Sequence, residues 1–89
     1  MKKLKITLQN KLGLHARASA KFVSTAGRFQ SQLNVTKDDK TINGKSIMGV
    51  MMLAASKGCE ITLAIDGPDE EHMADALSQL INNKFGEKE

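Results

Sequence analysis

Two residue types that handle phosphate well lie close together near the start of the chain, in the segment Gly13-Leu14-His15-Ala16-Arg17. The segment leads from a predicted loop into a predicted helix, whose first N–H groups lack a partner inside the helix and so favour an anion. Glycine permits a tight turn before the histidine. A neutral imidazole is a good nucleophile near neutral pH, and a guanidinium matches the geometry of phosphate oxygens. The pattern therefore suits His15 to hold a phosphoryl group that Arg17 stabilises.

The same histidine has plainer interpretations, which the residues alone leave open. A single histidine near a helix start is commonly a polar loop residue, and the sequence shows no partner carboxylate for it. A metal site is disfavoured because His72 is distant in the chain and Cys59 belongs to no ligand-spaced pair. A Ser/His/Asp triad is disfavoured because the chain has no nucleophile elbow. We expect neither a metal nor a cofactor.

A second segment, residues 45–53 with the sequence KSIMGVMML, carries more large apolar side chains than a short helix can bury in a domain this small. Ser46 fits the N-cap of that helix, where a phosphate would also be tolerated. Part of the helix should remain exposed as an adaptable, methionine-rich patch for partners, with ordinary core packing as the open alternative. The residues expected to reach the core are Val50, Leu53 and Ala54, and those expected to stay partly exposed are Ile47, Met48 and Met51.

The elements that hold these segments follow from apolar spacing. Period-two alternation predicts strands, with a hairpin turn over 37–40, and the strands cover residues 3–8, 32–36, 41–43 and 60–66. Helical spacing and capping residues predict helices over 16–26, over 47–54, and between Gly67-Pro68-Asp69 and Lys84. The order β-α-β-β-α-β-α predicts an α+β fold in which helices cover the apolar face of one four-stranded sheet.

Each helix also has an expected core face. In helix 16–26 this face comprises Ala16, Ala20, Val23 and Ala26, with Phe22 to one side and Gly27 at the end. In the last helix it comprises Met73, Leu77, Leu80 and Ile81, and residues 87–89 are expected to form a frayed tail.

Length and composition set outer limits on function. The chain has 89 residues, 40% hydrophobic and 26% charged, which fits one globular domain over 1–89 with no room for a deep cleft. The single cysteine cannot form an internal disulfide, so a reducing cytoplasm is the expected setting. The N-terminal lysines precede an alternating pattern, which is unlike a signal peptide, and no apolar run is long enough to span a membrane.

The net charge of +3 favours an acidic or phosphorylated partner. Nucleic-acid binding is not expected, because Trp and Tyr are absent and the 3 phenylalanines are too scattered to form a stacking platform.

Taken together, residues 10–17 (NKLGLHAR) and 44–51 (GKSIMGVM) closely resemble the histidine-containing phosphocarrier (HPr) family of the bacterial phosphoenolpyruvate-dependent phosphotransferase system. The resemblance covers the whole chain. It implies an open-faced β-sandwich, in which three helices cover one face of a four-stranded antiparallel sheet. It also implies a cytoplasmic protein that carries phosphoryl groups and is not itself an enzyme.

The resemblance further implies roles for individual residues. His15 would accept a phosphoryl group on Nδ1 from phosphorylated enzyme I and donate it to enzyme IIA proteins. Arg17 and the backbone N–H groups of Ala16, Arg17 and Ala18 would bind the phosphoryl oxygens. In many relatives the serine that matches Ser46 is phosphorylated by HPr kinase/phosphorylase. Ile47, Met48 and Met51 match the hydrophobic surface on which the partners of this family dock. A phosphate on the adjacent Ser46 would oppose that docking by its charge and its desolvation cost.

Two points depart from the simplest form of this interpretation. The family usually has proline where this chain has Ala18, and we expect the exchange to alter the lifetime of the phosphohistidine modestly. The residues also leave open a nitrogen-related branch of the system, or a mainly regulatory module gated by Ser46. A freely diffusing monomer suits a carrier that meets several partners in turn, and Cys59 is expected to be a small buried filler.

Overall fold

The computed structural model describes residues 1–88 and places the secondary structure close to the predicted positions. Within these residues lie four strands, three α-helices and one short 3-10 helix. The strands are β1 (Lys2–Thr7), β2 (Gln32–Lys37), β3 (Lys40–Asn43) and β4 (Glu60–Asp66). The helices are α1 (Ala16–Ala26), α2 (Ile47–Met52), α3 (Glu70–Asn82) and the 3-10 helix η1 (Lys84–Gly86).

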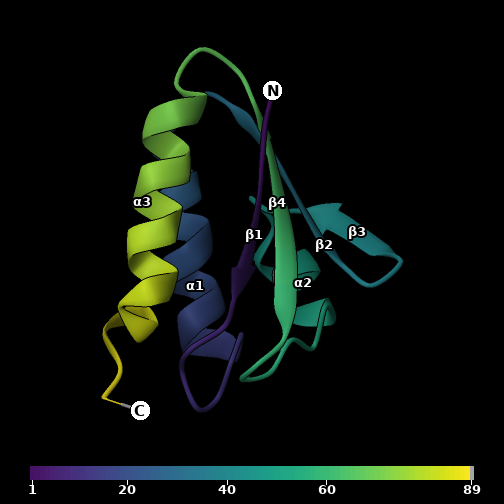
Figure 1. Cartoon of the computed structure of the whole chain (residues 1–89), viewed down its shortest axis with the longest axis vertical. Coiled ribbons are helices and arrows are strands. Elements are labelled where there is room, and N and C mark those ends of the chain that lie inside the picture. Colours follow the sequence, from purple (N-terminus) through teal and green to yellow (C-terminus); the bar gives the residue numbers. More distant parts are fainter. Residues whose placement is uncertain (89) are drawn as a thin grey trace.

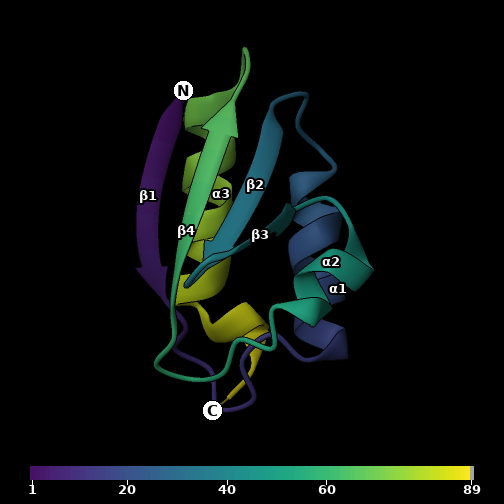
Figure 2. The ribbon, with the colours of Figure 1, turned by 90° about the vertical axis from the view of Figure 1, so that its right-hand side faces the viewer.

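The four strands form one antiparallel sheet in the order β1-β4-β2-β3. Helices α1 and α3 lie side by side against one face of this sheet, as Figure 1 shows, and α2 lies between α1 and β3 (Figure 2). The fold is therefore the predicted α+β open-faced sandwich. The predicted hairpin is also confirmed, since Lys37 pairs with Lys40 across a turn in which Asp38 has a φ of 57°.

The core lies between the helices and the central strands. Strand β4 contributes three side chains that are fully buried, Ile61, Leu63 and Ile65, as its alternation predicts. They pack with Leu33 and Val35 of β2, and the buried side of α3 covers them. Burying one such side chain is worth about 1.5–3 kcal/mol, so this face of the sheet fixes the positions of the helices.

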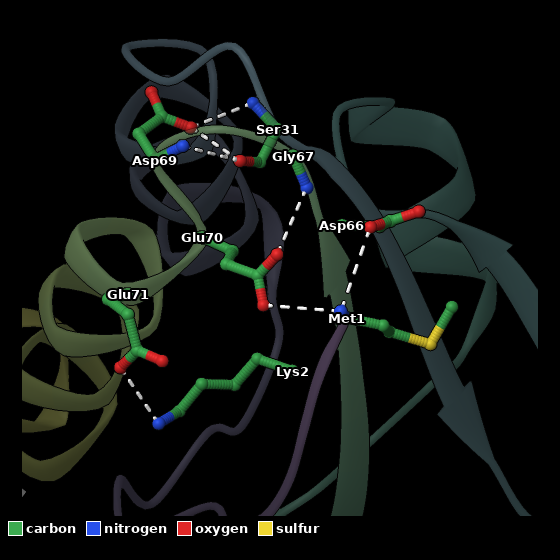
Figure 3. Close-up of polar contacts among 8 residues, drawn as sticks. All are labelled: Met1, Lys2, Ser31, Asp66, Gly67, Asp69, Glu70 and Glu71. Atoms are coloured by element: carbon green, nitrogen blue, oxygen red, sulfur yellow. Dashed lines mark hydrogen bonds and ion pairs between the residues drawn. The ribbon is translucent and has the colours of Figure 1, made fainter.

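The start of α3 is a closed polar network (Figure 3). The carboxylate of Asp69 accepts hydrogen bonds from the backbone N–H groups of Gln30 and Ser31, both at 2.9 Å, and from the Ser31 hydroxyl. The hydrogen bond from the Ser31 hydroxyl and that from the Gln30 N–H lower the pKa of Asp69 to about 2. Glu70 accepts from the N–H of Gly67 and pairs with the terminal ammonium of Met1. The carboxylates at this helix end thus bind the loop before β2, Gly67 and the N-terminus, and Asp69 makes no side-chain hydrogen bond that caps the helix.

The predicted core face of α1 is wrong in part. Ala16 and Ala20 are exposed, and the helix packs through a face turned away from them that comprises Ala18, Ser19, Phe22 and Ala26. Alanine is compatible with either side of a helix, so the alanine spacing did not decide the face. The large Phe22 side chain does decide it, because it is fully buried. The helix also ends without a left-handed residue, since Gly27 has a φ of −67°.

The end of α2 differs from the prediction as well. The helix stops at Met52, and Ala54 is exposed with a φ of 51°, whereas Val50, Leu53 and Ala55 are buried. The left-handed residue reverses the chain after the helix, which brings Ala55 to the core in place of Ala54. No helix within residues 1–88 is both long enough and apolar enough to cross a membrane.

Candidate functional site

His15 occupies the N-cap of α1. Its backbone is extended (φ −77°, ψ −178°), and its Nδ1 atom accepts the backbone N–H of Arg17 at 3.3 Å. The imidazole is therefore held at the positive end of the helix, with Nδ1 facing the first N–H groups. Those groups are the donors that an anion at this position would use.

The loop before His15 is held by contacts to the chain after α2 and to helix α1. Gly13 has a φ of +64°, and a Cβ at this position would lie 2.3 Å from the carbonyl oxygen of Ala55. Leu14 donates its N–H to the same oxygen at 2.9 Å, and the hydroxyl of Ser19 donates to the carbonyl of Leu14. Gly13 and Leu14 thus pack on the chain that follows α2, and this contact fixes where His15 enters the helix.

The other ring nitrogen of His15 has a partner that the sequence did not suggest. Its Nε2 atom contacts the carboxylate of Glu87, whose second oxygen accepts a hydrogen bond from Asn10 at 3.0 Å. The prediction of a frayed tail is therefore wrong for Glu87, whose side chain is only 17% exposed, while Glu89 lies outside the described residues. Glu87 and His15 are 72 positions apart, so no local pattern could reveal the pair.

Glu87 is held in its charged form. Burial raises the pKa of its carboxyl, but hydrogen bonds from Asn10 and His15 and the charges of His15 and Lys21 lower it further, so the pKa lies below the usual value. A carboxylate next to His15 corrects the expectation that the histidine has no acidic partner.

An open pocket surrounds the histidine. Arg17 and Ala16 are exposed at its rim, whereas Ala18 is fully buried on the inner face of α1. The pocket is lined by Lys11, Leu12, His15, Ala16, Arg17, Glu87 and Lys88. Three of these seven side chains are cationic, so the pocket favours an anionic group despite the carboxylate at its edge.

Helix α2 lies close to α1 (Figure 2), and several of its large apolar side chains are exposed. The predicted exposure is confirmed for Ile47 (44%), Met48 (74%) and Met51 (42%). The prediction missed Met52 and Leu12, both 64% exposed. Leu12 was overlooked because a single apolar residue in a polar loop has no periodic partner.

The predicted N-cap of α2 is confirmed, since the Ser46 hydroxyl accepts the N–H of Gly49 at 3.1 Å.

Cys59 is half-buried and not a fully buried filler. Hydrogen bonds from the Ser56 hydroxyl and backbone lower the pKa of its thiol. Within residues 1–88, no three His, Cys, Asp or Glu side chains gather as a metal site would require.

Comparison with known proteins agrees with this arrangement. The family model described as the PTS HPr component phosphorylation site matches residues 2–83. The chain belongs to the HPr family. The relatives named phosphocarrier protein HPr match it over nearly their full length, so this chain is a phosphocarrier of the phosphotransferase system.

Named relatives of this HPr-family chain come from several bacteria. The phosphocarrier protein HPr of Neisseria meningitidis serogroup B is 58% identical over 89 residues, which is 100% of both chains. HPr of Cupriavidus necator is 57% identical over 83 residues, 93% of each chain. Among solved structures, HPr-C-His from Thermoanaerobacter tengcongensis superposes with a TM-score of 0.96 at 50% identity and covers 100% of both chains.

Relatives also occur as dimers. The structure of an HPr dimer from Thermoanaerobacter tengcongensis matches with a TM-score of 0.79 and 52% identity, covering 98% of this chain and 100% of that one. Because such assemblies exist among relatives this similar, the expected monomer stays a prediction for this chain.

Proposed function

We propose that His15 accepts a phosphoryl group on Nδ1 from phosphorylated enzyme I and donates it to enzyme IIA proteins. The proposal is supported above all by the placement of Nδ1, which faces the backbone N–H of Arg17 at the start of α1. A phosphoryl group bonded to Nδ1 would lie over this helix end, where dipole and unpaired donors favour negative charge. The transfer needs no metal or cofactor from this chain.

The phosphoryl oxygens would be held by two kinds of donor. The N–H groups of Ala16, Arg17 and Ala18 belong to the first turn of α1 and have no carbonyl four residues earlier within the helix. The guanidinium of Arg17 lies at the rim of the same pocket and can bind two oxygens at once. Transfer would release the N–H of Arg17 from Nδ1 and turn it toward a phosphoryl oxygen.

Partner proteins would dock on the exposed patch beside the pocket. Enzyme I and enzyme IIA must each bring their reacting group to His15, so their contacts should extend onto neighbouring apolar side chains. Ile47, Met48 and Met51 supply such a surface on α2, and flexible methionines suit a site that accepts more than one partner. We refer to these three residues as the docking surface.

Ser46 would regulate that docking when phosphorylated by HPr kinase/phosphorylase. Its hydroxyl caps α2 directly before Ile47, so a phosphate there would place negative charge at the edge of the docking surface. We expect Ser46→Asp to slow transfer from enzyme I. Ser46→Asn is the matched control, because asparagine also caps helices but adds no charge. Equal slowing by both variants would assign the effect to the cap and contradict regulation by charge.

The test of the carrier function is the intact mass of the protein after incubation with phosphoenolpyruvate and enzyme I. Wild type and His72→Ala should each gain one acid-labile phosphoryl group, whereas His15→Ala should gain none. His72 is an exposed histidine on α3 and controls for loss of any imidazole. A phosphoryl group on His15→Ala would contradict the assignment of the acceptor. A wild type that remains unmodified beside an active control carrier would contradict the transfer itself.

A further inference from the structure

Three side chains from opposite ends of the sequence form a connected chain beneath the pocket. Asn10, in the loop after β1, donates from Nδ2 to the backbone carbonyl of Gly13 at 2.8 Å and to Oε1 of Glu87 at 3.0 Å. The second oxygen of Glu87, Oε2, contacts Nε2 of His15. Asn10 is fully buried, and the side chains of Glu87 and His15 are 17% and 27% exposed.

The C-terminal segment is shaped to deliver Glu87 to this position. After α3, the consecutive residues Lys84, Phe85 and Gly86 all have positive φ angles of 55°, 56° and 79°, and the chain turns aside at the end of the helix. The Phe85 ring is buried, and its carbonyl accepts a hydrogen bond from the Lys21 ammonium at 2.7 Å. In Figure 2 the C-terminal end accordingly lies beside the loop that precedes α1. Left-handed conformations are costly for Lys and Phe, so the surrounding packing must hold this turn in place.

The orientation of the Asn10 amide is determined by its neighbours. The carbonyl of Gly13 and the carboxylate of Glu87 are both acceptors, so the two hydrogens of Nδ2 must face them. Its Oδ1 atom is buried and has no hydrogen-bond partner among residues 1–88. The fold therefore leaves one amide oxygen unpaired in order to present two donors, and one of these donors orients Glu87.

Both ring nitrogens of His15 then require the same tautomer. An ionised carboxylate can only accept a hydrogen bond, so the proton must lie on Nε2. The N–H of Arg17 can only donate, so Nδ1 must offer its lone pair. The nucleophilic lone pair thus faces the helix end at which the phosphoryl group would be bound.

We propose that Asn10 and Glu87 are positioning residues that hold His15 as the Nε2–H tautomer and keep Nδ1 unprotonated, with its lone pair able to attack; this rests on the proposed function. In the transfer step, the Nδ1 lone pair forms the bond to phosphorus. The bond between phosphorus and the donor atom of phosphorylated enzyme I breaks, and that atom keeps the electron pair. The proton stays on Nε2, and the carboxylate of Glu87 balances the positive charge that the ring acquires.

The first experiment measures the tautomer of His15 from the ¹⁵N chemical shifts of its ring, at a pH where the ring is neutral. Wild type should show Nε2–H almost alone, and Glu87→Gln should show a mixture, because an amide can donate to Nε2 as well as accept from it. Asn10→Ala should also give a mixture, since Glu87 loses the group that orients it. Glu60→Gln, at an exposed carboxylate on β4, is the matched control and should match wild type.

The second experiment measures the initial rate at which phosphorylated enzyme I modifies the same proteins. Glu87→Gln should slow transfer about tenfold, the value of one hydrogen bond to a charged group, whereas Glu60→Gln should not change the rate. A wild-type tautomer ratio and a wild-type rate in Glu87→Gln would overturn the inference. The tautomer ratio needs no phosphoryl donor, so it tests Glu87 independently. Transfer to a residue other than His15 would instead overturn the proposed function.

Discussion

The two long helices begin in opposite ways. At the start of α3, Asp69 is held by backbone N–H groups, Glu70 pairs with the Met1 ammonium, and Glu71 pairs with Lys2 at 2.9 Å (Figure 3). That hydrogen bond and charge raise the pKa of Lys2. The first turn of α1 contains no acidic residue, and its leading N–H groups face the imidazole of His15.

The difference shows how one physical property serves two purposes. A helix start attracts negative charge wherever it occurs. At the start of α3 the chain supplies its own carboxylates, and these also bind the loop before β2 and the N-terminus. The first turn of α1 has no acidic residue, so its N–H groups and dipole can bind an anion that a partner protein delivers. The carboxylate of Glu87, which lies close to the start of α1, contacts Nε2 and leaves Nδ1 facing the helix.

The largest effect on phosphoryl transfer should come from removing the guanidinium of Arg17 at the start of α1. Arg17→Ala is expected to slow phosphoryl transfer from enzyme I about 10- to 100-fold, because hydrogen bonds to a charged group are worth about 1.5–3 kcal/mol. Arg28→Ala removes an exposed arginine beyond the other end of α1 and should leave the rate unchanged. Stopped-flow or quenched-flow transfer kinetics measure both. Equal rates for the two variants would show that Arg17 does not contact the phosphoryl group.

A carboxylate can also be introduced into the first turn of α1, where α3 has Glu70 and Glu71. Ala16→Glu places a carboxylate in the first turn of α1 at an exposed position, where it should occupy the N–H groups and repel the phosphoryl dianion. We expect transfer to slow about tenfold while thermal stability stays equal or rises, since a carboxylate at a helix start contributes about 0.3–1 kcal/mol. Ala20→Glu, exposed one turn later, is the control. The comparison between the two starts fails if Ala20→Glu slows transfer as much.

The opposite change removes a carboxylate from the polar network at the start of α3. Asp69→Asn should lower the melting temperature by several degrees at neutral pH and leave phosphoryl transfer unchanged, because this network is far from His15. The pKa of Asp69 is about 2 in the folded protein and 3.8 in an unperturbed aspartate. Its folded pKa is the lower of the two, so its stabilisation is present above about pH 4 and disappears as the pH falls toward 2.

Thermal unfolding from pH 7 down to pH 2 checks this expectation. The difference between wild type and Asp69→Asn should shrink through the acid range. Asp75→Asn, at an exposed position on α3, should track wild type throughout. A difference that is constant with pH would mean that Asp69 acts through packing and not through its charge.

The smallest effect is expected at the residue where the chain departs from its family. Ala18→Pro removes one N–H from the first turn of α1, so the phosphohistidine should be hydrolysed about threefold faster, as expected for the loss of one weak hydrogen bond. The acceptor should remain His15. Hydrolysis of the isolated phosphorylated proteins is followed by intact mass, and identical lifetimes would refute a role for this N–H.

The sequence allowed most of the fold to be predicted, because strand alternation and capping are local properties. The faces of β2 and β4 followed from the alternation of large aliphatic residues, and the Ser46 cap followed from its place before an apolar helix. The face of α1 did not follow, since alanines fit on either side of a helix. Burial of Phe22, a tertiary property, decides it.

The candidate site was predictable only on its local side. His15 and Arg17 are two positions apart, at a helix start that the sequence marks by itself. Asn10 and Glu87 meet across 77 positions, and their contact depends on a left-handed turn at Lys84 and Phe85 for which the residue types give no signal. A candidate site assembled from distant segments requires the three-dimensional structure.

The methionines of α2 have a consequence for chemistry that is unrelated to phosphate. Met48 and Met52 are 74% and 64% exposed, so peroxide can reach both thioethers while the fold is intact. Oxidation to the sulfoxide makes a flexible apolar side chain polar, and sulfoxide reductases reverse it. The proposed docking surface contains Met48 and adjoins Met52, so oxidative damage would weaken partner binding and leave His15 chemically intact.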